Sequence, residues 1–316
     1  MIISRTPLRV SIAGGGTDME YFYSRYSGKV ISFSINKYIY IIIKSRIDKK
    51  IVLNYKDREI VDSVDEIKHG LIRESLKKVG VYHGIEITSI ADIPSSGSGL
   101  GSSSAFTVGL LNALYGFKGI QKNQEQLAGE ACEIEIDILN APIGKQDQYA
   151  TSIGGLKAIK FNKDNTVDIK PINNDNNLYD NLLDNAILVN SNLYRDASKV
   201  LKVQKNNFSK NLETLIKINN SVDGVLDMLV DQDFNSLYCH LNDYSQAKNR
   251  LTDSNKNIKE IYDLYVPSIC HAGKICGAGG GGYFLFFTKE EFKDPLNRCL
   301  EIEIDNFGTT IIYNNY

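Results

Sequence analysis

The sequence predicts an α+β protein that folds as two domains, or as one unusually large α/β unit. Its 316 residues are about twice a typical domain of ~150 residues. Segments typical of strands fill its first part, and long helical patterns fill its second part. Hydrophobic residues at 42% and charged residues at 23% exclude a disordered, collagen-like or disulfide-scaffold chain.

The first strands are predicted from short segments rich in Ile, Val and Tyr. They cover Leu8–Ala13, Val30–Ile35, Tyr38–Ile43 and Ile51–Asn54. The two runs on either side of Asn36 and Lys37 predict a hairpin. A further strand at Gly84–Ile93 leads into the glycine-rich segment PSSGSGLGSSSAF and then into an apolar-periodic helix.

A second helix is predicted from about Gln124 to Leu139, and Pro142 ends it. A strand at Leu156–Phe161 follows. The polar stretch from Asn162 to Asn185 has no periodicity, so we predict a loop there and a domain boundary, with domains at 1–180 and 181–316.

The second domain is predicted to open with the strand Ala186–Asn190. Helical patterns then run from Asp196 to about Val230 and from Phe234 to Arg250. The segment ICGAGGGGYFLFF leads from glycines into an apolar strand, and a last strand is predicted near Thr310–Tyr313.

The charge balance excludes some classes of partner. The 36 basic and 38 acidic residues leave a net charge of −2, whereas proteins that bind nucleic acid or anionic membranes cluster Lys and Arg. We therefore expect no nucleic acid and no membrane partner. The longest apolar run, Tyr38–Ile43, is far shorter than a membrane span, and the first residues lack a signal-peptide core, so we expect a cytoplasmic protein.

The cysteine and histidine residues predict neither a disulfide framework nor a zinc site. The five cysteines are an odd number without a C-x-x-C pair, and the four histidines are far apart in the sequence. We expect the cysteines to be packing residues.

The first glycine-rich segment can bind a phosphate. Gly97, Gly99 and Gly101 allow close approach of the backbone to a ligand, and the following helix N-terminus favours an anion. It is neither a Walker A loop nor a Rossmann fingerprint, and the alternative is a tight turn without a ligand. Of the three serines Ser102, Ser103 and Ser104, one can cap the helix and another can meet a metal-bound phosphate.

Glu135 is a candidate metal ligand. On an ideal helix it lies among Ala128, Ala131 and Leu139, while Ile138 lies on the apolar side. An inward carboxylate needs a cation or donors, so Glu135 belongs either to a buried ion pair or to a Mg²⁺ site. Asp147, twelve residues further, is by itself a turn or cap residue.

Three segments together resemble the GHMP small-molecule kinases. They are RTPLRVSIAGGGTD (Arg5 to Asp18), IPSSGSGLGSSSA (Ile93 to Ala105) and ICGAGGGGYF (Ile275 to Phe284). The first pattern, with the later GKVIS, NKY and GKQDQY, is most similar to the sugar-1-kinase branch, whose members act on D-glycero-D-manno-heptose 7-phosphate or L-fucose. Galactokinases carry a Glu-His pair where Gly15 and Gly16 stand, which argues against galactose.

The resemblance implies a role for each matched residue. It makes Asp147 the catalytic base, held ionised by Arg9, and makes Glu135 and Ser103 the ligands of Mg²⁺. It implies nucleotide binding by the segment Ser95, Ser96, Gly97, Ser98, Gly99, Leu100, Gly101, Ser102 and Ser103. It implies acceptor binding by Gly15, Gly16, Thr17, Asp18, Gly279, Gly280 and Gly281.

The resemblance also implies an architecture and a reaction. The N-terminal domain is expected to be ribosomal-S5-like and the C-terminal domain ferredoxin-like, with the site between them. ATP and Mg²⁺ are the expected cofactors, and the anomeric hydroxyl of heptose 7-phosphate is the expected acceptor. The alternatives are a kinase for an unphosphorylated sugar such as L-fucose, and a catalytically silent sugar sensor.

A phosphorylated acceptor requires a cation in the acceptor site. The candidates are Lys29, Arg195 and Lys199, and Arg195 is favoured because a guanidinium fork suits phosphate and the residue begins a helix. A homodimer is a candidate assembly.

Overall fold

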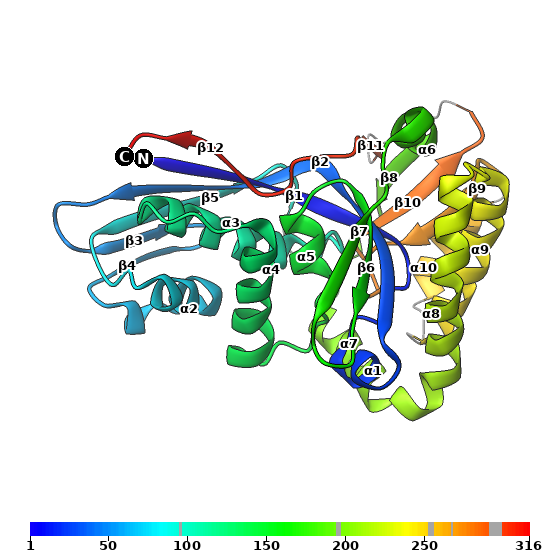
Figure 1. Ribbon diagram of the computed structural model, residues 1–316, viewed down its shortest axis with the longest axis horizontal. Helices are drawn as coiled ribbons and strands as arrows, with labels where there is room; N and C mark the ends of the chain where they lie inside the picture. Colours follow the sequence, from blue (N-terminus) through cyan, green and yellow to red (C-terminus); the bar gives the residue numbers. More distant parts are fainter. Residues whose placement is uncertain (95–96, 194–196, 252–255, 267, 291–298) are drawn as a thin grey trace.

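The computed structural model describes residues 1–94, 97–193, 197–251, 256–266, 268–290 and 299–316. It contains two β-sheets with helices packed on them (Figure 1). The first sheet has eight strands and the second has four. One large apolar cluster includes residues of both sheets and of the helices between them, so the two halves of the chain share a core.

The first sheet is centred on two long strands, β1 (Ile2–Ala13) and β2 (Gly28–Ser45). Its main path runs β12-β1-β2-β5-β3-β4, and β6 and β7 branch from β2. The remaining strands are β3 (Ile51–Asn54), β4 (Arg58–Val61), β5 (Ile85–Ala91), β6 (Leu156–Phe161), β7 (Val167–Pro171) and β12 (Thr310–Asn314). The only parallel pair on this path is β3 with β5, among the residues that the structure describes.

The predicted hairpin at Asn36 and Lys37 is wrong, because both residues lie inside the continuous strand β2. The register against β1 shifts between Pro7 and Leu8, and the two residues bulge out there. The amide of Asn36 donates to the carbonyl of Glu303 at 3.0 Å. On one side of this bulge β2 pairs with β6, and on the other with β5, so the bulge lets one strand serve two branches of the sheet.

Helices cover the first sheet. The buried helix α3 (Ser102–Phe117) packs on β1 and β2, and apolar residues occupy most of its circumference, as expected of a buried helix. Its neighbours are α2 (Gly70–Val79), α4 (Gln124–Cys132) and α5 (Gln146–Ser152). The short elements α1 (Glu20–Tyr26) and η1 (Val64–Glu66) complete this part of the chain.

The second predicted helix is confirmed, but its last part is a π-helix, η2 (Glu133–Ile138). The amide of Leu139 donates to the carbonyl of Ile134, five residues earlier. The wider turn rotates the following side chains away from their ideal positions. Ile138, which was expected on the apolar side, is therefore 43% exposed.

The prediction of a loop over Asn162–Asn185 is wrong. This stretch contains β7, a 3-10 turn η3 (Asp175–Asn177) and the helix α6 (Leu178–Leu183). β7 pairs with β6, and Leu178 and Leu182 are buried in the core. The polar composition hid these elements because only a few apolar side chains face inward.

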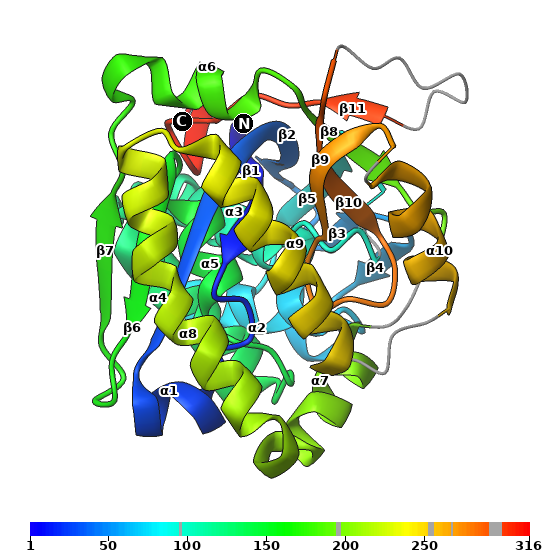
Figure 2. The same ribbon diagram turned by 90° about the vertical axis from the view of Figure 1, so that its right-hand side faces the viewer.

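The second sheet is antiparallel and has the order β11-β8-β10-β9. Its strands are β8 (Ala186–Asn190), β9 (Cys270–Ile275), β10 (Tyr283–Thr288) and β11 (Cys299–Glu301). The antiparallel helices α8 (Phe208–Val230) and α9 (Phe234–Leu251) run side by side (Figure 2). α8 packs on the first sheet and α9 on β9.

The helical pattern predicted from Asp196 to Val230 is two helices. α7 (Ala197–Asn206) ends before Asn207, and α8 begins after it. α10 (Lys256–Tyr265) follows α9. No helix among the described residues is both long enough and apolar enough to cross a bilayer.

The last strand, β12, returns to the first sheet and pairs with β1. The two ends of the chain therefore lie together at one end of the molecule (Figure 1). The carboxyl-terminal residues thus complete a sheet that the amino-terminal residues begin.

Candidate active site

The first glycine-rich segment joins β5 to α3. Gly99 and Gly101 have φ of 74° and 75°, in the left-handed region that favours glycine. α3 begins at Ser102, and no side chain caps its first amides. The expectation that a serine caps this helix is wrong, because the hydroxyl of Ser102 lies 2.8 Å from that of Ser98. The uncapped amides remain available for an anion.

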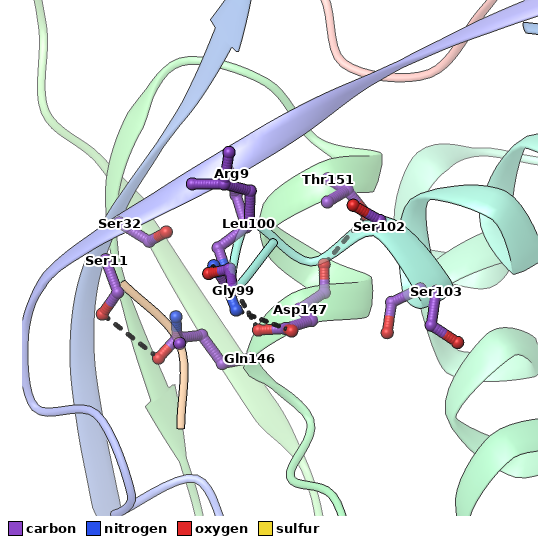
Figure 3. Close-up of polar contacts among 12 residues, drawn as sticks. Arg9, Ser11, Ser32, Gly99, Leu100, Ser102, Ser103, Gln146, Asp147 and Thr151 are labelled. Atoms are coloured by element: carbon purple, nitrogen blue, oxygen red, sulfur yellow. Dashed lines mark hydrogen bonds and ion pairs between the residues drawn. The ribbon is translucent and has the colours of Figure 1, made fainter. Parts of the chain in front are cut away.

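Arg9 and Asp147 form a two-pronged ion pair next to this loop. Nε and Nη2 of Arg9 donate to the two carboxylate oxygens of Asp147 at 2.8 and 2.7 Å, and Nη1 donates to the carbonyl of Gly99 at 2.6 Å. Arg9 is buried, whereas the side chain of Asp147 is 29% exposed. Figure 3 shows the two side chains facing one another beside Gly99. The guanidinium therefore orients a carboxylate that remains accessible from the cavity.

Glu135 lies inside the protein, as the helical pattern predicts. It is 1% exposed, and its oxygens accept hydrogen bonds from Ser103 at 3.1 Å, Ser104 at 2.8 Å, Thr107 at 3.1 Å and the side-chain amide of Gln148. Burial raises the pKa of Glu135, and these four donors lower it in part. No described cation forms an ion pair with it, so the interpretation as a buried ion pair is wrong.

The spacing of the Ser103 and Glu135 oxygen atoms fits two ligands of a magnesium ion. Ligand oxygens on adjacent corners of an octahedron with metal–oxygen distances of about 2.1 Å lie about 3.0 Å apart. The Ser103 hydroxyl and Oε1 of Glu135 are 3.1 Å apart, and both residues line the cavity described below. Ser104 and Gln148 hold the other carboxylate oxygen in place.

Asp18 lies close enough to Asp147 for the two carboxylates to repel one another. Its carboxylate accepts hydrogen bonds from the amides of Gly16 at 3.1 Å and Gln146 at 3.2 Å. Burial and the charge of Asp147 raise the pKa of Asp18, while the backbone donors lower it. A Cβ at Gly144 would overlap the Asp18 carboxylate, so only glycine allows these two segments to meet.

One cavity of about 360 Å³ connects these groups. The predicted site residues that line it are Arg9, Gly15, Gly16, Asp18, Gly97, Ser98, Gly99, Gly101, Ser102, Ser103, Glu135 and Asp147. Residues that are 138 positions apart in the sequence, such as Arg9 and Asp147, therefore face the same space.

Other predicted site residues take different positions. The side chain of Leu100 is buried in the core, and its carbonyl accepts from the amide of Arg9 at 3.0 Å. The hydroxyl of Thr17 donates to the carbonyls of Gly14 and Lys29. From the third glycine-rich segment, Gly277 and Ala278 line the cavity, whereas the described residues Gly279, Gly280 and Gly281 do not. Ser95, Ser96 and Arg195 lie outside the described residues.

The third glycine-rich segment packs directly on the first. The amide of Tyr283 donates to the carbonyl of Ser98 at 3.0 Å, and a Cβ on Gly99 would lie 2.6 Å from the carbonyl oxygen of Cys276. The two loops therefore meet backbone to backbone, which explains why both are rich in glycine.

Several polar residues that the sequence patterns did not identify also line the cavity. Among them are Ser11, Gln146, Ser198, Gln204, Lys248 and Lys274. Ser11 faces Gln146, which precedes Asp147 in the chain (Figure 3), and the side-chain oxygens of Ser11 and Gln146 are 3.4 Å apart. Lys274 interrupts an apolar strand just before the glycines, which is a signal for a buried lysine. Lys248 has no such signal, because it is one of several lysines in polar helical segments.

Comparison with known proteins agrees with this arrangement. Residues 66–155 match the family model described as the GHMP kinases N terminal domain. The matched segment contains the first glycine-rich loop, Glu135 and Asp147.

The similarity extends over nearly the whole chain. The chain is 29% identical to the D-glycero-alpha-D-manno-heptose 7-phosphate kinase of Campylobacter jejuni, and the alignment covers 96% of this chain and 94% of that relative. A shorter match, also 29% identical, joins 51% of the chain to 20% of the L-fucokinase/L-fucose-1-P guanylyltransferase of Bacteroides fragilis. The crystal structure of a D-glycero-D-manno-heptose 1-phosphate kinase from Bacteroides thetaiotaomicron has a TM-score of 0.81, with 22% identity and 100% coverage of both chains.

Proposed function

We propose that this protein is an ATP- and Mg²⁺-dependent sugar kinase that phosphorylates the anomeric hydroxyl of D-glycero-D-manno-heptose 7-phosphate, giving the 1,7-bisphosphate. The observation that carries this proposal is the Arg9–Asp147 pair, which opens into the same cavity as Glu135, Ser103 and the first glycine loop. These are the groups that phosphoryl transfer from a nucleotide requires.

Asp147 acts as the base in this proposal. A bond forms between the anomeric oxygen and the γ-phosphorus of ATP, the bond from that phosphorus to the β-phosphate oxygen breaks, and the hydroxyl proton passes to Asp147. Arg9 holds both carboxylate oxygens in one orientation and faces the transferring group. The amides at the start of α3 hold the nucleotide phosphates.

Glu135 and Ser103 hold Mg²⁺ in this proposal, supported by Ser104, Thr107 and Gln148. When bound, the ion offsets the negative charge of the nucleotide phosphates. Gln148 follows Asp147 directly in α5, so this helix links the proposed base to the proposed metal ligand.

The choice of substrate rests on the relatives and on the chemistry of the acceptor. The names of the two heptose kinases differ in the position of the acceptor phosphate, at carbon 7 in one and at carbon 1 in the other. We favour heptose 7-phosphate for two reasons. The relative named for it has the higher sequence identity, and the anomeric hydroxyl of this sugar is free to accept a phosphoryl group. L-Fucose is the second candidate, favoured by the match to the fucokinase. A silent sugar sensor is disfavoured, because Arg9, Glu135 and Asp147 are all present.

An ADP-release assay across sugars and sugar phosphates, with and without Mg²⁺, tests this proposal. Heptose 7-phosphate is expected to give the highest kcat/KM, and chelation of Mg²⁺ is expected to abolish turnover. ³¹P NMR of the product then identifies the new phosphate at the anomeric carbon. ADP release with L-fucose but not with the heptose phosphate would favour the second candidate, and no release with any sugar would reject the kinase.

The base is tested with Asp147→Asn, which retains the shape of the side chain but cannot accept the proton. We expect kcat to fall by about a hundredfold or more, with a smaller change in the KM for ATP. The matched control is Asp231→Asn at an exposed position after α8, which is expected to retain full activity. Unchanged kcat in Asp147→Asn would exclude Asp147 as the base.

A further inference from the structure

The cavity contains a second group of polar side chains, around Gly15. Lys248 extends from α9 and Lys274 from β9, and both line the cavity. The ring of Tyr244 lies between these segments, with Nζ of Lys274 at 4.8 Å and Nζ of Lys248 at 5.9 Å from its centroid. Two cations thus lie against one aromatic ring next to the proposed acceptor site.

Lys274 is a buried lysine without an anionic partner in the described part of the chain. Its side chain is 2% exposed, and Nζ donates only to the backbone carbonyls of Ser11 and Ile12, among the contacts of the described residues. Arg9, by contrast, is paired with Asp147. Burial, followed by the charges of Lys248 and Arg9, lowers the pKa of Lys274 to about 7. An unpaired buried charge of this kind is costly unless a ligand compensates it.

The hydroxyl of Tyr244 is a second sign of a ligand site, independent of the two lysines. Its hydroxyl is buried and has no hydrogen-bond partner among the described residues, although buried hydroxyls are nearly always bonded. A Cβ built on Gly15 would lie 3.0 Å from this hydroxyl, 3.1 Å from Nζ of Lys248 and 3.8 Å from the hydroxyl of Ser11. The three polar groups therefore converge on the space above Gly15.

Gly15 keeps this space open. Its neighbours Gly14 and Gly16 have φ of 81° and 102°, which favours glycine for backbone reasons, but Gly15 has no such requirement. The lack of a side chain at Gly15 instead leaves room between Tyr244 and Lys248. A ligand group that enters here meets hydrogen-bond donors and positive charge.

We propose that Lys248, Lys274, Tyr244 and Ser11 form an anion subsite that binds the phosphate at the far end of the acceptor sugar. This inference rests on the proposed function and specifies how the acceptor is selected. A phosphate supplies the acceptors that Tyr244 and the two ammonium groups can use, and its charge offsets the charge of Lys274. Ser11 adds a hydroxyl that also contacts Gln146, next to Asp147.

The positions of the other candidate cations agree with this choice. Lys29 pairs with Asp223 at 2.6 Å, and Lys199 is exposed on α7. Neither residue lines the cavity. Arg195 lies outside the described residues, so the subsite is assigned from Lys248 and Lys274.

The most selective test is Tyr244→Phe, because it removes only a hydroxyl that has no hydrogen-bond partner in the described part of the chain. We expect the KM for heptose 7-phosphate to rise three- to tenfold, while the KM for ATP and the Tm stay unchanged. Lys248→Met and Lys274→Met are expected to raise the same KM by tenfold or more. The kcat/KM for the unphosphorylated heptose is expected to stay within about twofold in all three variants.

The control is Lys199→Met, which removes an exposed lysine outside the cavity and is expected to change neither KM. A similar loss for the phosphorylated and unphosphorylated sugars in the three variants would overturn the subsite, and so would an effect confined to Lys199→Met. If Lys274→Met does not fold, Tyr244→Phe and Lys248→Met decide the question.

Binding without turnover separates this inference from the proposed function. Calorimetry with heptose 7-phosphate in the absence of ATP is expected to show binding to the wild-type protein and at least tenfold weaker binding to Lys248→Met. Binding that depends on Lys248 without ADP release would reject the kinase and retain the subsite. ADP release with equal affinity for the sugar with and without its phosphate would retain the kinase and reject the subsite.

Discussion

Glu135, the proposed metal ligand, carries a cost in stability because its carboxylate is buried. Its carboxylate is almost completely buried, and burial raises its pKa above the ordinary value of 4.5. The charged form is stabilised by four donors, three of which are hydroxyls that can also accept a hydrogen bond. A glutamine could therefore occupy the same space without losing all of its partners.

We predict that Glu135→Gln lowers kcat by about a hundredfold and does not reduce stability at neutral pH. A carboxyl whose pKa is raised by folding contributes stability below its unfolded pKa of about 4.5, and this contribution is lost as the pH rises through the folded pKa. The free energy of unfolding of the wild type, relative to the variant, should thus decrease as the pH rises from about 4.5. Urea denaturation from pH 4.5 to pH 8 measures this difference.

The control for this variant is Glu133→Gln in the same π-helix. Glu133 pairs with Lys78 at the surface, and its side chain is 46% exposed. We expect its removal to leave activity intact. A pH-independent loss of stability in Glu135→Gln would show that the hydrogen bonds outweigh the cost of the buried charge.

At the scale of the element, α4 and η2 determine where Glu135 points. α4 begins with a capping box, in which Asn123 accepts from the amide of Gln126 at 2.8 Å and the Gln126 side chain accepts from the amide of Asn123 at 3.0 Å. The π-turn at the other end exposes Ile138 while Glu135 stays inside. The capping box therefore fixes the start of the helix, and the π-helix widens it at Glu135, the proposed metal ligand.

We predict that Asn123→Ala destabilises the protein by about 1 kcal/mol, because it leaves an amide of the first turn without its partner. Asn123→Asp retains an acceptor and should have a stability close to that of the wild type. Both residues of the capping box are exposed and lie outside the cavity, so activity per folded molecule should not change. Urea denaturation of the three proteins measures the effect, and equal stability of both variants would argue against the cap.

At the scale of the whole molecule, the two glycine loops join the halves of the chain. Gly282 has a φ of 89°, and a Cβ there would overlap the carbonyl of Ser98 and lie 2.6 Å from that of Gly97. Because Gly282 follows β9 and Gly97 follows β5, this contact couples the second sheet to the proposed nucleotide loop. The return of β12 to the first sheet is a second link of this kind.

We predict that Gly282→Ala loses more stability than Gly80→Ala and raises the KM for ATP at least tenfold. Gly80 has a φ of 72° with no atom within 4 Å of a built Cβ, so its alanine variant has only the left-handed strain of about 1–2 kcal/mol. Gly282→Ala has a similar strain and must also displace the loop that we propose binds the nucleotide. Thermal denaturation and initial rates measure both effects, and equal losses would show that the loops separate freely.

The sequence determined much of the fold without help from the tertiary structure. The strands Ile51–Asn54, Leu156–Phe161 and Ala186–Asn190 have the predicted bounds, because compact runs of apolar residues specify strands locally. The sequence around Asn36 and Lys37 predicts a hairpin, because a bulge and a turn have the same local pattern until the partner strands are known. The elements between Asn162 and Asn185 escaped prediction because their few inward side chains follow no clear period.

The same division holds for the site. Motifs and helical periodicity predicted the glycine loop and the inward position of Glu135. The family resemblance predicted Arg9 and Asp147 as site residues. Only the tertiary structure shows that Arg9 donates two hydrogen bonds to Asp147. It also brings Lys248, Lys274 and Tyr244 together near Gly15. Periodicity reports which way a side chain faces within its own element, whereas the partners of a side chain depend on which distant elements pack against it.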